Sequence, residues 1–482
     1  MGDADEQLLR QRKDFWDHQD PTLEAMIQTK SQGLADDDAD EVMAYLPDLR
    51  GKRVIDLAAG IGRFTTRLAK VASQVTAVDV AEAFIKENRA RNQHLGNVSF
   101  ICSDVVKLDF PEGSFDLVFS NWLLKYLSNA ELIQFLSRVL KWLSPGGFFF
   151  FRESCYNSVG TLDAMNNPTV YHKPQFYLGL LRDATGDDQS SFRLVRSKSI
   201  LVYINHKNAP NQVCFLAEKV SHGDVANLKE PQCRLSSLDA AALEKAFRGP
   251  CLTMGGTATT RDFCGRLGLR AGQRVLDVGC GTGASAVFMA RHLGVHVHGV
   301  DLSPSRVFTA IERQMNVDSE LRKKLQFEMR DVLSLDCEED TYHAIHVRDT
   351  LHKFTNKKDL FVKFCRWLRP GGTIFVTDYC KGGTTPSQHF LNHVQQIQPC
   401  SLDTAESHEM WMREAGLKGV TMDVLGQEFI KILQNDLNVL ASTCGDSDED
   451  KLTHKEVTAQ WTNQLKWVRE GYITWASFVG SK

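Results

Sequence analysis

Two glycine-rich turns carry the clearest chemistry in this sequence. Each has an aspartate in a short apolar run, followed by small residues at every second position: Asp277, Gly279, Gly281 and Gly283 in one, Asp56, Ala58, Gly60 and Gly62 in the other. A turn of this kind lets the backbone approach a ligand closely, and the helix after it presents a partly positive N-terminus. Dinucleotide-binding turns instead have the spacing G-x-G-x-x-G, with a pyrophosphate at the helix end. The carboxylate at the start of each turn favours a cationic amino group over a pyrophosphate.

Two further pairs of aspartates follow the turns at matching distances. Asp79 and Asp301 end the next apolar runs, where a carboxylate can accept hydrogen bonds from both hydroxyls of a ribose. Asp104 and Asp331 end the third runs and fit a contact with an adenine amino group. Any of them could instead cap a helix, but three matched aspartates per copy favour a nucleoside ligand. With the acidic start of the glycine turn, this pattern resembles motif I of the class I S-adenosylmethionine-dependent methyltransferases.

The landmarks repeat once along the chain, at an offset of 221 to 227 residues, and end with Pro-Gly-Gly at 145–147 and 370–372. Two copies of one domain explain this order. Each copy alternates short apolar runs with helix-length amphipathic segments, as βαβ units do. The predicted fold class is α/β, with two tandem Rossmann-like domains of the class I methyltransferase type, each a mostly parallel sheet with a terminal antiparallel hairpin.

The first copy is predicted to contain strands at 53–57, 74–79, 115–120 and 147–152, a helix at 63–72 and a terminal hairpin of strands 200–205 and 212–216. A polar, irregular stretch follows it. We therefore predict a first domain at 1–220, a linker at 221–238 and a second domain at 239–482.

Composition narrows the class of protein. The formal net charge is −4, and no cluster of Lys and Arg suggests a nucleic-acid surface. No apolar run approaches the roughly 20 residues of a membrane span, and the first residues carry no apolar targeting segment. The twelve cysteines form no CxxC pair, so a zinc or redox site is not indicated. We expect a cytoplasmic enzyme with reduced thiols and no metal, monomeric, acting on a small molecule.

Several segments closely resemble the phosphoethanolamine N-methyltransferases of plants and nematodes. They are 59–65, 119–128, 151–155 and 167–171 in the first copy, and 254–256, 348–350, 363–372 and 377–380 in the second. The resemblance covers nearly the whole chain, in the order of the two-domain plant form. It implies S-adenosylmethionine as cofactor, a first methylation of phosphoethanolamine in domain 1, and two further methylations in domain 2 that give phosphocholine, a phosphatidylcholine precursor.

The second copy departs from the phosphobase site that the resemblance implies. It keeps Asp349 and Tyr379, but Lys353 stands where the family has a histidine, and most other positions of the site carry unrelated residues. His352 is a neighbour of that position, yet a slip of one residue turns a side chain elsewhere. We expect domain 2 to bind the cofactor and to handle a phosphobase poorly.

The first copy is better preserved, and the candidate residues of the substrate site come from it. The catalytic candidates are Asn121, which we place opposite Asp349, and Tyr126, Glu153 and Tyr171. The substrate-binding candidates are Trp16, Arg152, Tyr171, His172 and Tyr177, with Lys173 as a further cation. The cofactor-binding candidates are Asp56, Gly60, Gly62, Asp79, Asp104, Asp277, Gly279, Gly281, Gly283, Asp301, Asp331 and, from the resemblance, Arg348.

Two alternatives to phosphoethanolamine methylation stay open. A methyltransferase of another small amine or acid would keep every cofactor residue and differ around Tyr171 and Tyr177. A largely non-catalytic pair of cofactor-binding domains would explain why arginines of the phosphate site are missing from both copies. A protein or RNA methyltransferase would carry a basic groove or an Asn-Pro-Pro-aromatic motif, and the sequence has neither.

Overall fold

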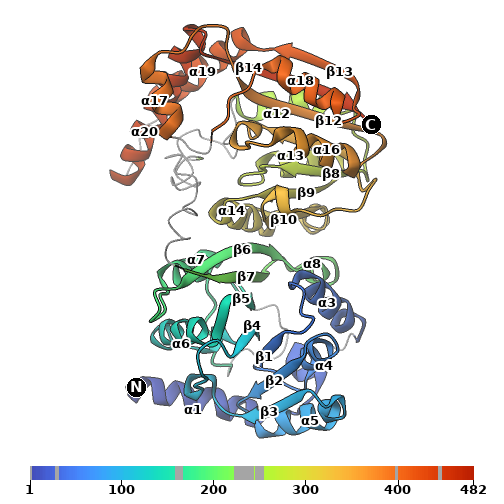
Figure 1. Cartoon of the computed structure of the whole chain (residues 1–482), viewed down its shortest axis with the longest axis vertical. Helices are drawn as coiled ribbons and strands as arrows, with labels where there is room; N and C mark the ends of the chain where they lie inside the picture. Colours follow the sequence, from blue (N-terminus) through green and yellow to red (C-terminus); the bar gives the residue numbers. More distant parts are fainter. Residues whose placement is uncertain are drawn as a thin grey trace. The chain divides into compact units, whose positions relative to one another are not determined.

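The computed structural model describes residues 3–27, 32–157, 167–221, 244, 255–396, 400–442 and 448–482 (Figure 1). The chain divides into two compact units, Met1–Leu228 and Lys229–Lys482. Of the predicted linker, only residue 221 lies within the described ranges. In those ranges no helix is long and apolar enough to cross a membrane, and no group of His, Cys, Asp and Glu could hold a metal ion.

The sheet of the first unit has the strand order β6-β7-β5-β4-β1-β2-β3. The strands are β1 (Arg53–Leu57), β2 (Gln74–Asp79), β3 (Val98–Cys102), β4 (Phe115–Asn121), β5 (Leu143–Ser154), β6 (Ser191–Ser199) and β7 (Gln212–Val220). The five strands from β5 to β3 are parallel, whereas β7 runs antiparallel to β5 and β6. β1 pairs with β2 on one side and with β4 on the other, so the strand order reverses between β1 and β4. The crevice outside the carboxyl ends of β1 and β4 is therefore the place where sheets of this kind bind ligands.

Helices cover both faces of this sheet (Figure 1). They are α1 (Asp3–Asp17), α2 (Leu23–Ile27), α3 (Gln32–Tyr45), α4 (Arg63–Ala69), α5 (Glu82–Asn92), α6 (Asn129–Trp142), α7 (Pro174–Asp183) and α8 (Leu201–Lys207). Phe149 and Phe150 are neighbours on β5 and point to opposite faces. Phe150 packs against Tyr45 of α3, and Phe149 packs against Phe135 of α6. The continuous aromatic run in β5 thus serves two cores.

The terminal hairpin of the first unit differs from the prediction. Residues 200–205, predicted as a strand, belong mostly to α8, and the partner of β7 is β6. The cause is a distant contact, since the carboxylate of Glu41 accepts hydrogen bonds from the backbone N–H groups of Leu201 and Val202, both at 2.9 Å. A carboxylate there satisfies free N–H groups at the helix start and suits its dipole. The apolar run 200–204 is typical of a strand, and the residues near it in the sequence do not reveal that Glu41 caps a helix there.

A buried ion-pair cluster joins α3, α4 and β5. The carboxylate of Asp38 accepts from Arg63 at 2.7 Å and from Arg152, and the Asp38 side chain is only 1% exposed. The Arg152 side chain is fully buried. Two buried guanidinium groups therefore share one buried carboxylate. These ion pairs attach α3 to α4 and to the central strand β5.

Asp38→Ala should lower the free energy of unfolding of the first unit by about 3–5 kcal/mol, because it leaves two buried cations without a counter-charge. Urea unfolding followed by circular dichroism measures the loss. Asp36→Ala is the matched control: Asp36 is an exposed partner of Arg67, and its removal should change the free energy of unfolding by less than about 0.5 kcal/mol. Equal effects of the two variants would contradict the role given to Asp38.

The second unit repeats the plan, with the strand order β13-β14-β12-β11-β8-β9-β10. Its strands are β8 (Arg274–Val278), β9 (His296–Asp301), β10 (Leu325–Met329), β11 (Tyr342–Arg348), β12 (Leu368–Lys381), β13 (Lys418–Val424) and β14 (Ile473–Ser481). Its helices are α12 (Gly256–Arg266), α13 (Ala284–Leu293), α14 (Pro304–Met315), α15 (Ser319–Arg322), α16 (Lys357–Trp367), α17 (Gln388–Gln396), α18 (Ala405–Glu414), α19 (Gly426–Ala441) and α20 (Asp448–Arg469). β14 pairs antiparallel with β12 and β13. The predicted fold class, two tandem α/β domains with mostly parallel sheets and antiparallel terminal strands, is confirmed.

Candidate functional site

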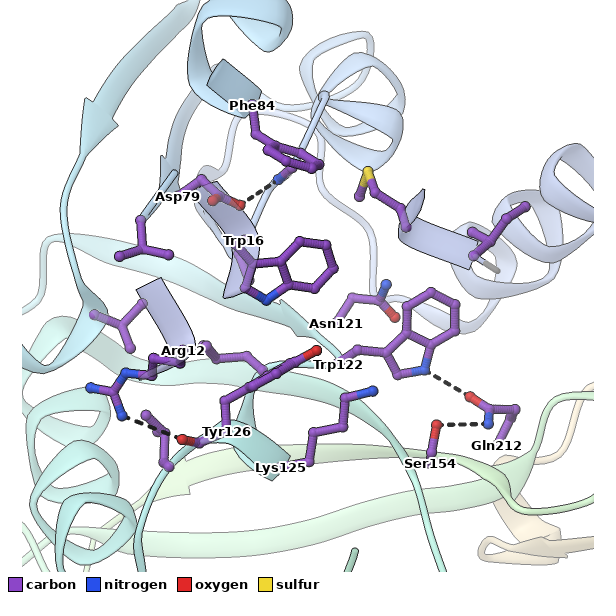
Figure 2. A pocket seen from close by; sticks show the side chains of 18 of the residues that line it. Arg12, Trp16, Asp79, Phe84, Asn121, Trp122, Lys125, Tyr126, Ser154 and Gln212 are labelled. Atoms are coloured by element: carbon purple, nitrogen blue, oxygen red, sulfur yellow. Dashed lines mark hydrogen bonds between the residues drawn. The ribbon is translucent and has the colours of Figure 1, made fainter. Parts of the chain in front are cut away.

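A pocket of the first unit lies at the carboxyl ends of β1 and β4 (Figure 2). Ala58 and Gly60, after β1, and Asp79, at the end of β2, form one part of its wall. Arg12 and Trp16 of α1 form another part. The segment after β4 contributes Asn121, Trp122, Leu123, Lys125, Tyr126 and Leu127. The pocket thus occupies the crevice that the strand order marks as a ligand site.

The glycine turn of the first unit is closed by Asp79. The N–H of Gly60 donates to Asp79 Oδ2 at 2.8 Å, and the N–H of Ala81 donates to Asp79 Oδ1 at 3.0 Å. Gly60 has φ +54°, and a Cβ there would lie 2.2 Å from the Met26 methyl carbon. Gly62 has φ +84°, and a Cβ there would lie 2.3 Å from Asn88 Oδ1. The turn brings bare backbone to the pocket, as a close ligand contact requires.

The second unit builds the same turn. Gly279, Gly281 and Gly283 all have positive φ, at +71°, +54° and +77°. The N–H of Gly281 donates to Asp301 Oδ2 at 2.8 Å, and the N–H of Ser303 donates to Asp301 Oδ1 at 2.9 Å. The predicted glycines and the second aspartate of each copy therefore stand in equivalent positions.

The first aspartate of each turn lies under it, away from the pocket lining. Asp56 is 2% exposed and accepts a hydrogen bond from Thr65 Oγ1 at 2.6 Å. Burial raises the pKa of Asp56 to about 7. In the second unit, Asp277 lies 2.7 Å from His346 Nδ1. These two carboxylates support the turns, and a direct contact with a ligand ammonium stays a prediction.

Asp104, the third predicted cofactor residue, is paired with a residue that the sequence did not point to. Arg12 donates to both carboxylate oxygens of Asp104, at 3.2 and 3.0 Å, and to both of Glu131, at 2.9 Å. Arg12 also donates to the carbonyl of Tyr126 at 3.3 Å (Figure 2). Its four-residue spacing from Trp16, which puts both side chains on one helix face, was the available signal. In the second unit Asp331 accepts from the N–H of Leu333 at 2.9 Å.

The register of the strands corrects one correspondence between the copies. Ser120 pairs with Leu57 and Val347 pairs with Val278, so Asn121 corresponds to Arg348 and Trp122 to Asp349. Trp122 and Asp349 also share a left-handed backbone, with φ +59° and +50°. The placement of Asn121 opposite Asp349 was wrong by one residue. Asn121 still lines the pocket, where its side-chain oxygen accepts from Arg152 Nε at 2.6 Å.

Three of the predicted aromatic residues line the pocket: Trp16, Tyr126 and Tyr171. The rings of Trp16 and Tyr126 are 6.0 Å apart, between centroids. Burial raises the pKa of the Tyr126 phenol above its ordinary value and so further disfavours its anionic form. The structure therefore brings these aromatic side chains and the glycine turn into the lining of one pocket.

The predicted catalytic residue Glu153 lies beneath the segment that follows β4. Its side chain is fully buried and accepts from the N–H of Leu124 at 2.7 Å. Burial raises the pKa of Glu153 to about 7, although the charge of Lys125 and backbone N–H groups act in the opposite direction. Glu153 does not line the pocket that the structure describes.

Three predicted substrate-binding residues also lie outside this lining: Arg152, His172 and Tyr177. Arg152 is held by Asp38 and lies 4.3 Å under the ring of Trp122. His172 stacks on Phe176, with ring centroids 3.8 Å apart, and Tyr177 is 1% exposed among aromatic side chains. Burial and ion pairing hold Arg152, burial holds Tyr177, and ring stacking holds His172. Their roles in substrate binding stay predictions.

Sequence reasoning missed several lining residues. Lys125 and Lys207 are the two lysines of the pocket, and Ser154 and Gln212 belong to it as well. Gln212 accepts from Trp122 Nε1 at 2.7 Å and donates to Ser154 at 2.9 Å (Figure 2). Lys125 belongs to the motif 119–128 that carries the family resemblance. The neighbouring residues, however, do not indicate whether a lysine at this position lines a pocket or is exposed.

The second unit places its candidate residues in hydrogen-bonded pairs. Asp349 Oδ1 accepts from Trp475 Nε1 at 2.7 Å and from Thr377 Oγ1 at 2.9 Å. His352 Nδ1 lies 2.7 Å from Asp378, which is itself fully buried. Arg348 is 5% exposed and donates to Thr260 at 2.6 Å, so its predicted contact with the cofactor stays a prediction.

Glu153→Gln should flatten the pH dependence of stability of the first unit. The pKa of Glu153 in the folded protein is about 7, above its ordinary 4.5, so the stability that protonated Glu153 contributes is complete below about pH 4.5 and lost as pH rises through about 7. A shift of this size corresponds to roughly 3 kcal/mol. Urea unfolding at pH 5 and pH 8 measures it, and the difference between the two should shrink in Glu153→Gln. The exposed Glu112→Gln should leave the difference unchanged; an unchanged difference in Glu153→Gln as well would contradict the expectation.

Comparisons with known proteins agree along the whole chain. Models described as "Methyltransferase domain" match residues 54–147 and 257–422. Phosphoethanolamine N-methyltransferase 1 of Zea mays is 34% identical, over 98% of this chain and 96% of its own length. Phosphoethanolamine N-methyltransferase 3 of Arabidopsis thaliana is 33% identical, over 98% of both chains.

A solved structure has the same fold. Phosphoethanolamine N-methyltransferase 1 of Haemonchus contortus, in complex with phosphoethanolamine and S-adenosylhomocysteine, superposes with a TM-score of 0.71 over 99% of this chain and 98% of its own. Its sequence is 22% identical to this chain. The likeness in structure therefore shows the fold, and the relationship rests on the plant sequences.

Proposed function

Because this chain belongs to the phosphoethanolamine N-methyltransferase family, we propose that its first unit methylates the amine of phosphoethanolamine in the pocket of Figure 2. The chain is an S-adenosylmethionine-dependent N-methyltransferase. The observation that carries the assignment to the first unit is the pocket itself, which is lined both by a bare glycine turn and by aromatic side chains.

The residues of the first unit suit the cofactor. A Cβ at Gly60 would clash with Met26. Because Gly60 has no side chain, a ligand can lie directly against the backbone of the turn. Asp79 accepts from the backbone N–H groups of Gly60 and Ala81 and lines the pocket, where its carboxylate can also accept from ribose hydroxyls. S-adenosylmethionine supplies an electrophilic methyl group when it is bound there.

The substrate amine must be neutral and aligned when it attacks. An alkylamine titrates near pH 10, so holding it neutral at pH 7 costs about 4 kcal/mol. Tyr126 and Tyr171 line the pocket, and their hydroxyls can accept hydrogen bonds from the amine and fix its direction. The rings of Trp16 and Tyr126 then face the methylated, cationic product and stabilise it.

The second unit is proposed to bind the cofactor without acting efficiently on a phosphobase. Its glycine turn matches that of the first unit. Asp349 accepts from both Trp475 and Thr377, and His352 is paired with Asp378. These partners compete with any substrate amine for the acid and base groups of that site.

The net charge of −4 and the thiols found free support a cytoplasmic enzyme that acts on a dissolved small molecule. We also propose that the chain acts as a monomer. A nucleic-acid substrate is disfavoured by the same net charge.

Gly60→Arg should reduce methylation of phosphoethanolamine by at least about 100-fold, roughly 3 kcal/mol of transition-state stabilisation, because the side chain fills the turn against Met26. Gly281→Arg is the matched control in the second unit and should leave the first methylation within about 2-fold. Transfer of labelled methyl from S-adenosylmethionine, with mass spectrometry of the product, measures both.

Circular dichroism shows whether each variant is folded. The assignment to the first unit fails if Gly60→Arg is folded and active, or if Gly281→Arg alone loses the first methylation. Methylation by the unaltered chain of another small amine in preference to phosphoethanolamine would overturn the choice of substrate.

A further inference from the structure

Lys125 occupies an unusual position for a lysine. It lies in the 3-10 turn η3 (Leu124–Tyr126) that follows β4, and it lines the pocket. Its Nζ lies 5.9 Å from the ring of Trp122, 5.4 Å from that of Tyr126 and 5.9 Å from that of Tyr171. Figure 2 shows the amine between Trp122 and Tyr126. Three aromatic rings thus lie around this cation.

The arginines at this site are already neutralised. Arg12 is bound to Asp104 and Glu131, and Arg152, below the pocket, is bound to Asp38. Within the described part of the chain, Lys125 and Lys207 have no carboxylate at ion-pair distance. Glu153 is near Lys125, but its carboxyl group faces the N–H of Leu124. The pocket therefore has two lysines whose charge is available to a ligand.

A partly desolvated cation without a counter-ion is stabilised by an anion. Burial lowers the pKa of Lys125, although Glu153 and Tyr171 act in the opposite direction, which agrees with a cation that lacks a close partner. The proposed substrate carries a phosphate dianion, which needs cationic donors. His172, Lys173 and Arg152, the cations expected from the sequence, do not line the pocket.

We propose that Lys125 binds the phosphate group of the substrate and makes the first unit selective for phosphorylated over free ethanolamine. The inference rests on the proposed function, since it places the substrate of that reaction in this pocket. Lys207, on α8, is the second lysine that lines the same pocket, and we assign it to the same phosphate subsite. In this arrangement the lysines hold the phosphate end, while the amine end is directed to the glycine turn and the methyl donor.

Lys125→Met keeps the length and apolar stem of the side chain and removes the charge. In the full chain it should raise KM for phosphoethanolamine roughly 10- to 100-fold, as expected for a lost charged hydrogen bond, with kcat changed less than about 3-fold. Lys125→Arg should restore KM to within a few fold. Lys86→Met removes the same charge from an exposed site on α5 and should change neither constant.

Calorimetric titration with phosphoethanolamine, in the presence of S-adenosylhomocysteine, tests the same contact without turnover. The affinity should fall in Lys125→Met, while the affinity for S-adenosylhomocysteine, measured alone, stays that of the unaltered chain. Free ethanolamine should be a poor substrate of the unaltered chain. In Lys125→Met, the ratio of kcat/KM for phosphoethanolamine to kcat/KM for ethanolamine should be smaller.

An unchanged KM and unchanged phosphoethanolamine affinity in Lys125→Met would overturn the proposal, as would a fall in kcat alone, which would mean that Lys125 acts on the amine. If the unaltered chain binds phosphoethanolamine through Lys125 but does not methylate it, the proposed function fails and the phosphate subsite stands. If it methylates phosphoethanolamine and Lys125→Met is indistinguishable from it, the function stands and the subsite fails.

Discussion

The N-terminal helix reaches the pocket through one buried guanidinium group. Arg12 spans Asp104 after β3, Glu131 at the start of α6 and the carbonyl of Tyr126 after β4. Both carboxylates together compensate the buried charge of Arg12. Without them, the cost of desolvating the guanidinium group would destabilise the docked position of α1. Trp16, one helical turn further on, reaches the pocket wall on the same helix face and packs there against Phe84 and Tyr126. The site therefore depends on a segment that precedes the whole repeated fold in sequence.

The two units show how one scaffold diverges at a few equivalent positions. Where the first unit has Trp122, the second has Asp349, held by Trp475. The register also matches Lys125 with His352, and Glu153 with Asp378. In the first unit the basic group faces the pocket and the acid lies below it; in the second, His352 and Asp378 bind each other at 2.7 Å. The glycine turns have hardly changed, because they need a backbone conformation that few residues allow.

The sequence predicts best what is set by neighbouring residues. The repeated sheets and both glycine turns follow from local patterns, and these expectations agree with the structure. The error at the hairpin comes from a contact between distant residues, because Glu41 caps α8. Pairing with Asp38 and burial likewise place Arg152 and Tyr177 outside the pocket lining, and their roles in substrate binding stay predictions. The four-residue spacing of Arg12 from Trp16 was a local signal, but its partners Asp104 and Glu131 come from distant segments. Lys125 had no comparable signal, because its place in the pocket depends on residues that are distant in the sequence.

The Glu41 cap on α8 bears on how the first unit is made. Glu41 and Leu201 are 160 residues apart in the chain, so α8 gains its cap only after nearly the whole unit has left the ribosome. Loop closure over such a distance is slow compared with local helix formation. The wall that carries Lys207 should therefore be among the last parts of the unit to become ordered during synthesis.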